Sequence, residues 1–137
     1  MDTSLYEDRI RETLRSLSNL PQDNQTALLH GDYWLGNIIW RDEKLVAVID
    51  WEDAALGDPL ADLANTRLEI LWALGEDAMR DFTTQYQDLM PQLNYKNLPY
   101  RDLAATLKPI ATMHAWGLDA ATEARMREQL RWFVERA

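Results

Sequence analysis

The chain has 137 residues, of which 47% are hydrophobic and 27% are charged, and this composition predicts one soluble domain with a hydrophobic core. Its 14 Lys and Arg residues against 23 Asp and Glu give a formal net charge of −9. This balance argues against a nucleic-acid partner, because such partners demand a positive face, and it suits divalent cations or a cationic small molecule. The chain contains no cysteine, which excludes disulfides, thiolate zinc sites and cysteine nucleophiles.

The N-terminal residues and the apolar runs of the sequence bear on where the chain works. Residues 1–4 are not a basic segment followed by an apolar stretch, so we expect no signal peptide. No uninterrupted apolar run is longer than that of residues 45–49, which is far shorter than the ~20 residues that a membrane span needs. We therefore expect a cytoplasmic protein without a membrane partner.

The first part of the chain predicts one helix and a small β element. Over residues 4–18 apolar side chains recur at helical spacing, and charged residues such as Glu7 fall on the outer face. The inward positions are Tyr6, Ile10, Leu14 and Leu17. Residues 27–29 predict a short buried strand, or an extended segment, that leads to His30. The apolar stretches 38–40 and 45–49, joined by four polar residues, predict a β-hairpin.

From Asp58 onward the pattern is helical. Asp58 followed by Pro59 is typical of a helix start, with a capping carboxylate before a proline at the first helical position, and Gly75 ends this helix. Further helices are predicted over 76–90 and 99–116, and a last one begins after Asp119. Within 99–116, His114 falls on the apolar side and is interpreted as a core histidine.

Two segments carry side chains that suit phosphate chemistry. In the segment 30–37, Asp32 supplies a carboxylate and Asn37, five residues later, supplies an amide oxygen on a glycine-containing loop. Asp50 follows the apolar strand predicted over 45–49. A set of ligands made only of oxygen is what Mg²⁺ prefers, with substrate phosphate and water completing the octahedron.

The order His30, Asp32, Asn37 and Asp50 resembles the catalytic core of kinase-like phosphotransferases. The His-Gly-Asp form at 30–32, Ile-Asp-Trp-Glu at 49–52 and Gly-Asp-Pro-Leu-Ala-Asp-Leu-Ala at 57–64 are similar to the aminoglycoside phosphotransferase and choline kinase family. The resemblance implies an α+β, mostly α, fold. The chain would be a single domain over 1–137, the helical C-terminal lobe of a protein-kinase-like fold, with a small β-hairpin carrying the catalytic and metal-binding loops.

The resemblance also implies roles for individual residues. Asp32 would be the catalytic base, Asn37 and Asp50 would hold Mg²⁺, and His30 would brace the loop. Asp58 would cap its helix and support the loop, and both Asp58 and Asp62 are interpreted as structural. For Glu52, a secondary role in the site stays open beside plain surface charge. The implied cofactors are Mg²⁺ and ATP or GTP, and the implied partner is a small-molecule hydroxyl acceptor, for which the acidic surface favours a cationic aminosugar or amino alcohol.

The chain also lacks features of a complete kinase. Its first 29 residues contain no glycine and no lysine, so the glycine-rich loop and the strand lysine of the N-terminal nucleotide lobe are missing. We therefore expect the chain alone to be inactive, and to self-associate through the apolar surface that a companion lobe would cover. Two alternatives stay open: a non-catalytic helical binding module, and a metal-dependent hydrolase, which is disfavoured because His30 and His114 form no histidine-rich cluster.

Overall fold

In the computed structural model of the chain, the described residues are 5–137, and they form two compact units. Unit 1 consists of the chain up to Pro21 together with 95–137, and unit 2 consists of residues 22–94. Every site residue predicted from the sequence lies in unit 2, and the single-domain organisation stays a prediction. Among the residues that the structure describes, no helix has the length and apolar character that crossing a membrane requires.

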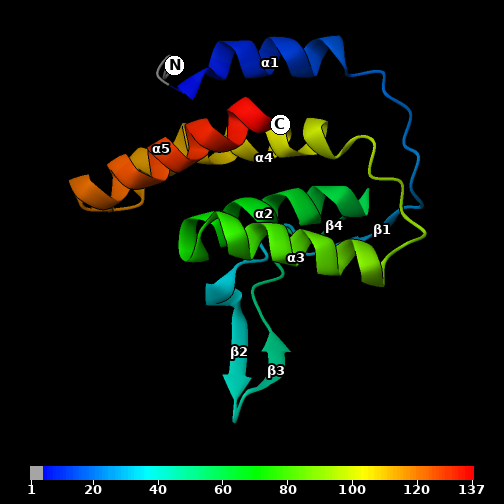
Figure 1. Cartoon of the computed structure of the whole chain (residues 1–137), viewed down its shortest axis with the longest axis vertical. Helices are drawn as coiled ribbons and strands as arrows, with labels where there is room; N and C mark the ends of the chain where they lie inside the picture. The colour runs from blue at the N-terminus through cyan, green and yellow to red at the C-terminus, as the bar shows by residue number, and fades with distance from the viewer. Residues whose placement is uncertain (1–4) are drawn as a thin grey trace. The chain divides into compact units, whose positions relative to one another are not determined.

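Unit 1 is all helical (Figure 1). It contains α1 (Glu7–Ser16), α4 (Leu98–Thr112), the short 3-10 helix η3 (Met113–Ala115) and α5 (Ala120–Arg136). Helix α4 packs against both α1 and α5. Asp119 caps α5 as predicted, because its carboxylate accepts the Thr122 backbone N–H at 2.8 Å. The buried apolar side chains of this unit are Leu5, Ile10, Leu98, Ile110, Met113, Leu130 and Phe133.

Three predictions for unit 1 are corrected. The helix expected over 4–18 spans only Glu7–Ser16, and residue 4 lies outside the described residues. Glu7 is buried rather than exposed, and it is tolerated there because Arg11 pairs with it at 2.8 Å. His114 is exposed instead of lying in the core. The α-helix ends at Thr112 and tightens into η3, whose three residues per turn move His114 away from the face that α-helical spacing gives it.

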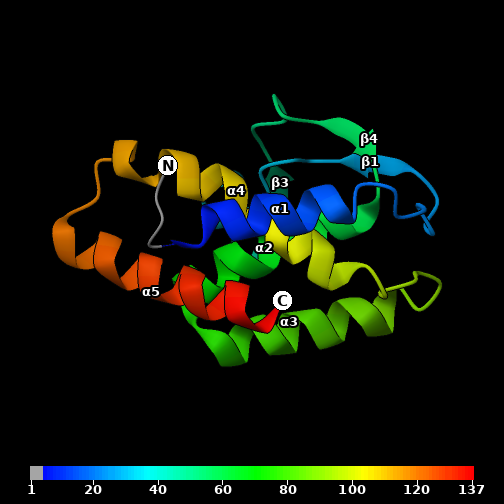
Figure 2. The same cartoon turned by 90° about the horizontal axis from the view of Figure 1, so that it is seen from above.

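Unit 2 combines two helices with two small antiparallel sheets. Helix α2 (Pro59–Leu74) packs against α3 (Glu76–Leu89) and against β1 (Ala27–Leu29). Strand β1 pairs with β4 (Ala55–Gly57), and the two lie side by side in Figure 2. The second sheet is the predicted hairpin of β2 (Ile38–Arg41) and β3 (Lys44–Val48), which projects from the helix pair in Figure 1. The mostly helical α+β fold class is thereby confirmed.

Helix α2 begins and ends where the sequence predicts. Asp58 adopts an extended backbone and accepts the Leu60 N–H at 3.0 Å, and Pro59 takes the first helical position. Gly75 ends the helix with φ +92°, a backbone conformation that favours glycine. The buried apolar face of the helix is formed by Leu60, Leu63, Ala64, Leu68, Leu71 and Trp72. Asp62 lies in the first turn of this helix.

Candidate functional site

Asn37 closes the loop that carries Asp32. Its side-chain Nδ2 donates to the Asp32 main-chain oxygen at 2.8 Å and lies 3.4 Å from the Asp32 carboxylate. Because a carbonyl oxygen can only accept, the Asn37 amide must present its nitrogen here, and its oxygen is the atom left for a cation. Asn37 is only 5% exposed, whereas Asp32 is half-buried. Asn37 therefore holds the Asp32 segment of the loop in place, while the Asp32 side chain keeps partial access to solvent.

His30 joins this loop to the end of the hairpin. Its Nε2 lies 2.8 Å from the Ile49 carbonyl, and the Asp32 backbone N–H donates to its Nδ1 at 3.1 Å. Since the carbonyl can only accept and the N–H can only donate, these two bonds use Nε2 as the donor and Nδ1 as the acceptor. The Trp51 ring packs beside the imidazole, with centroids 4.5 Å apart. The buried His30 thus fixes the loop from within.

Asp62 of α2 binds the backbone of the same loop. Its two carboxylate oxygens accept the backbone N–H groups of His30, at 2.6 Å, and Gly31, at 3.0 Å. Gly31 has φ +85°, and a Cβ there would lie 2.5 Å from the main-chain oxygen of Asp53, so only glycine fits. The sequence pattern gave Asp62 no specific partner. The structure shows that the Asp62 side chain attaches the backbone of His30 and Gly31 to the first turn of α2.

Asp58 occupies the start of α2 and is 4% exposed. Besides capping the helix, as predicted, its Oδ1 accepts a hydrogen bond from Asn24 Nδ2 at 3.2 Å. Asp62, one helical turn later, supplies the two hydrogen bonds to the loop backbone described above. Direct support of the loop by Asp58 stays a prediction.

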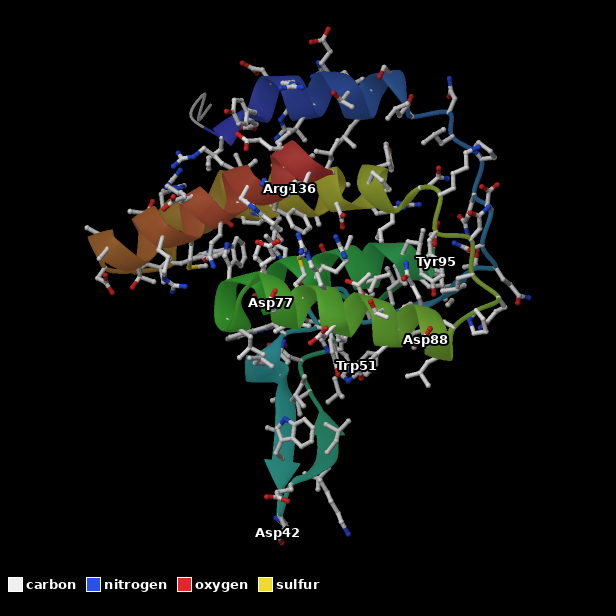
Figure 3. All side chains as sticks on the ribbon, viewed as in Figure 1. Asp42, Trp51, Asp77, Asp88, Tyr95 and Arg136 are labelled. Atoms are coloured by element: carbon white, nitrogen blue, oxygen red, sulfur yellow. The ribbon has the colours of Figure 1, made fainter. Side chains whose placement is uncertain are left out.

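Asp50 lies at the base of the hairpin, beside Asn37. The Ile49 N–H donates to the Asn37 carbonyl at 2.9 Å, which extends the hairpin pairing by one step and brings the chain before Asp50 against Asn37. Figure 3 shows Trp51 at this end of the hairpin and Asp42 at its tip. Asp50 is exposed and has φ +64°, a left-handed conformation that aspartate tolerates better than most side chains.

Asn37 and Asp50 carry oxygen donors of the kind that Mg²⁺ prefers, an amide oxygen and an exposed carboxylate. Within residues 5–137, no group of three or more histidine or acidic side chains is placed to hold a metal ion. A two-ligand set still suits Mg²⁺, because this ion retains waters and takes substrate phosphates rather than an all-protein cage. Glu52 is exposed two residues after Asp50, and its secondary role stays a prediction.

The phenol of Tyr86 in α3 is close enough to Asp62 and Asp58 for their charges to affect its pKa. Partial burial raises the pKa of its phenol, and the nearby negative charges of Asp62 and Asp58 raise it further. The apolar pattern of residues 76–90 places Tyr86 inside the unit but says nothing of these neighbours. The raised pKa therefore comes first from burial and then from two carboxylates at the start of α2.

Comparison with known proteins identifies related sequences and folds. Residues 2–95 match the family model described as the APH phosphotransferase enzyme family. The chain is 41% identical over 69 residues to acyl-CoA dehydrogenase family member 10 of Mus musculus, a match that covers 49% of this chain and 6% of that protein. It is 44% identical over 59 residues to family member 11 of Pongo abelii, covering 41% of this chain and 8% of that protein.

Among solved structures, the chain matches a thermostable mutant of aminoglycoside phosphotransferase APH(4)-Ia. The ternary complex of that enzyme with AMP-PNP and hygromycin B gives a TM-score of 0.67 at 21% identity, over 98% of this chain and 45% of that chain. The apo form gives 0.67 at 22% identity, over 99% and 45%. These likenesses show the kinase-like fold. The chain spans less than half the length of the matched structures and a small fraction of the relatives above.

Proposed function

We propose that this chain, which belongs to the phosphotransferase enzyme family, is the C-terminal lobe of a kinase that transfers the γ-phosphate of ATP or GTP to a hydroxyl group of a small molecule. One observation carries the proposal. Asn37 binds Asp32 through its side-chain nitrogen and binds the residue before Asp50 through its main-chain oxygen. A single buried residue thus organises a base and an oxygen-only cation site.

In the proposed reaction, the Asp32 carboxylate accepts the proton of the acceptor hydroxyl. The hydroxyl oxygen forms a bond to the γ-phosphorus while the bond from that phosphorus to the bridging oxygen breaks, and the nucleoside diphosphate leaves. Asn37 and Asp50 would hold Mg²⁺, which neutralises phosphate charge when it is bound. The protein's part is then positioning, which falls to His30 and Asp62 through their bonds to the loop.

The acceptor we propose is cationic, such as an aminosugar or an amino alcohol. Residues 30–62 contain eight acidic side chains against Arg41 and Lys44 only. Like charges in this number raise the local concentration of a positive ligand. The name of the matched aminoglycoside phosphotransferase, and its complex with AMP-PNP and hygromycin B, support a nucleotide donor and an acceptor of this kind.

We further propose that a nucleotide-binding lobe outside this chain completes the site. The chain covers 45% of the matched kinase-like structure. The absence of glycine and lysine from its first 29 residues means that these residues supply no glycine-rich loop or strand lysine for the phosphates. We therefore expect little or no phosphotransfer from the chain alone. The proposed cation site at Asn37 and Asp50 can be tested without the second lobe.

The test is a titration with Mn²⁺, as a paramagnetic substitute for Mg²⁺, in the presence of ATP, followed by NMR line broadening. Asp50→Ala is compared with Asp42→Ala, a matched control. Both residues are exposed aspartates with positive φ, at +64° and +50°, but Asp42 lies at the far tip of the hairpin (Figure 3). We expect saturable, ATP-dependent broadening around Asn37 in the parent chain and in Asp42→Ala, and its loss in Asp50→Ala.

Other results would favour the alternatives. Broadening that is absent from the parent chain, or that both variants lose equally, would contradict the cation site and favour a non-catalytic binding module. Release of inorganic phosphate from ATP without any acceptor, abolished by Asp32→Asn, would favour a metal-dependent hydrolase. Phosphorylation of an amino alcohol or aminosugar after a nucleotide lobe is supplied would support the kinase.

A further inference from the structure

The side chain of Asn24 ties together the two ends of unit 2. Asn24 comes shortly before β1, and Asn94 follows α3, 70 residues later. The Asn94 N–H donates to Asn24 Oδ1 at 2.7 Å, and Asn24 Nδ2 donates back to the Asn94 carbonyl at 3.0 Å. This reciprocal pair reproduces with a side chain the bonding of two strands. Asn24 is 8% exposed, so water does not readily replace these bonds.

The same amide reaches the start of α2. Asn24 Nδ2 also donates to Asp58 Oδ1 at 3.2 Å, and that oxygen accepts the Leu60 N–H that caps the helix. Both bonds made by Nδ2 require an N–H donor, and the bond from Asn94 requires an acceptor on the same short side chain. Asparagine satisfies all three. Aspartate lacks the donor, alanine lacks both groups, and glutamine is longer by one methylene.

The helix transmits this contact to the site. Asp58 and Asp62 are separated by about one turn of α2, a rigid distance. Asp62 in turn accepts the N–H groups of His30 and Gly31, and the next residue of that loop is Asp32. Polar contacts at Asp58 and at Asp62, joined by one turn of α2, therefore link the ends of unit 2 to the loop that carries the proposed base.

We propose that Asn24 is a positioning residue. By its hydrogen bonds to Asn94 and to the Asp58 cap, it fixes the first turn of α2, and with it the positions of Asp62 and Asp32. The effect of Asn24 on catalysis rests on the proposed function. Its effect on the structure can be measured independently, because loss of the Asn24 amide should loosen the 30–32 loop more than it loosens the rest of unit 2. That selective effect distinguishes positioning from general stabilisation.

The experiment follows the Gly31 amide in the full ¹⁵N-labelled chain, by chemical shift and by hydrogen exchange. Asn24→Asp keeps the acceptor and removes the donor, placing a carboxylate beside Asp58. Asn97→Asp is the matched control, since the Asn97 side-chain amide donates a long bond to the Pro21 carbonyl, at 3.4 Å, within unit 1. We expect Gly31 exchange in Asn24→Asp to rise about tenfold relative to the amides of α3, and to stay unchanged in the control.

A double variant separates loss of the contact between positions 24 and 58 from general destabilisation of the unit. In the double variant Asn24→Asp with Asp58→Asn, the amide and the carboxylate change places, so an N–H···O contact between positions 24 and 58 can form again, and we expect part of the Gly31 protection to return. If Asn24→Asp does not fold, Asn24→Ser removes the amide without adding charge. Gly31 exchange that is unchanged, or that rises only in parallel with α3, would overturn the proposal. Since the readout needs no nucleotide, failure of the Mn²⁺ titration in the parent chain would instead count against the proposed function.

Discussion

Replacement of Asp62 by asparagine tests how firmly α2 holds the loop of residues 30–37. In the structure both carboxylate oxygens accept backbone N–H groups, at 2.6 Å from His30 and 3.0 Å from Gly31. Asparagine can keep one of these bonds, but its NH₂ group then faces the other donor, which loses its partner. A hydrogen bond to a charged group contributes about 1.5–3 kcal/mol. Because Asp62 is half-buried, and so partly screened by water, we expect the lower part of that range.

The expected result is therefore a fall of about 2 kcal/mol in the free energy of unfolding, measured by urea titration followed by circular dichroism. The matched control is Asp81→Asn, which changes an exposed aspartate on α3 and should stay within about 0.5 kcal/mol of the parent chain. A loss for Asp62→Asn no larger than that of the control would refute the view that these two bonds anchor the loop.

Tyr86 gives a second readout of the same variant. Burial is the main cause of its raised pKa, and the charges of Asp62 and Asp58 add to it. Asp62→Asn should therefore lower the Tyr86 pKa toward the ordinary 10.0 without reaching it, as seen in the phenolate absorbance that Tyr86→Phe removes. A raised folded-state pKa gives stability that is complete below pH 10.0 and is lost as pH rises through the raised value. This alkaline loss should be smaller in Asp62→Asn, and an unchanged Tyr86 titration would contradict the placement of the two side chains.

Three further predictions concern the rest of the chain. Asp42 and Glu43 form the hairpin turn with φ +50° and +62°, so Glu43→Gly should raise the free energy of unfolding by about 0.5–1 kcal/mol, and a decrease would contradict this account of the turn. The Asp119 pKa is lowered by hydrogen bonds from the backbone and then the side chain of Thr122. The stability that this cap contributes is present above pH 3.8 and is lost as pH falls through the lowered pKa, so acid should reduce the helicity of α5. Asp119→Asn should make α5 helicity less dependent on pH. Trp40 is 59% exposed on the hairpin, and Trp40→Ser should weaken the self-association that the sequence predicts. A parent chain that sediments as a monomer at high concentration would count against this prediction.

The parts of the fold that the sequence predicts well are those defined by local patterns. The Asp58-Pro59 start and the Gly75 end of α2 depend on backbone groups within one turn, and both were located correctly. Strand β4 was not predicted, because Ala55–Gly57 is too short for an alternating pattern and is defined only by its pairing with β1. His114 was placed wrongly because helical spacing was extended past Thr112, where α4 gives way to a 3-10 turn.

The candidate site shows the same division between near and distant contacts. The resemblance of their order and spacing to kinase-like phosphotransferases points to Asp32, Asn37 and Asp50, and the structure brings Asn37 against both Asp32 and the residue before Asp50. The partners of Asp62 lie 31 and 32 residues away, and those of Asn24 lie 34 and 70 residues away. A single aspartate or asparagine has no periodicity that points to so distant a partner, so these roles could be found only once the chain was folded.

The range of these contacts also separates what each one controls. Asn37 acts on Asp32 across five residues, and its contact belongs to the loop itself. His30 reaches the Ile49 carbonyl across 19 residues and fixes the loop against the hairpin that bears Asp50. Asp62 and Asn24 act through α2 and decide where the whole loop sits, not what it contains. Loss of Asn37 should therefore remove the cation site outright. Loss of the remote contacts should leave the cation site formed but misplaced relative to the phosphates, which would lower the rate of transfer more than the affinity for nucleotide.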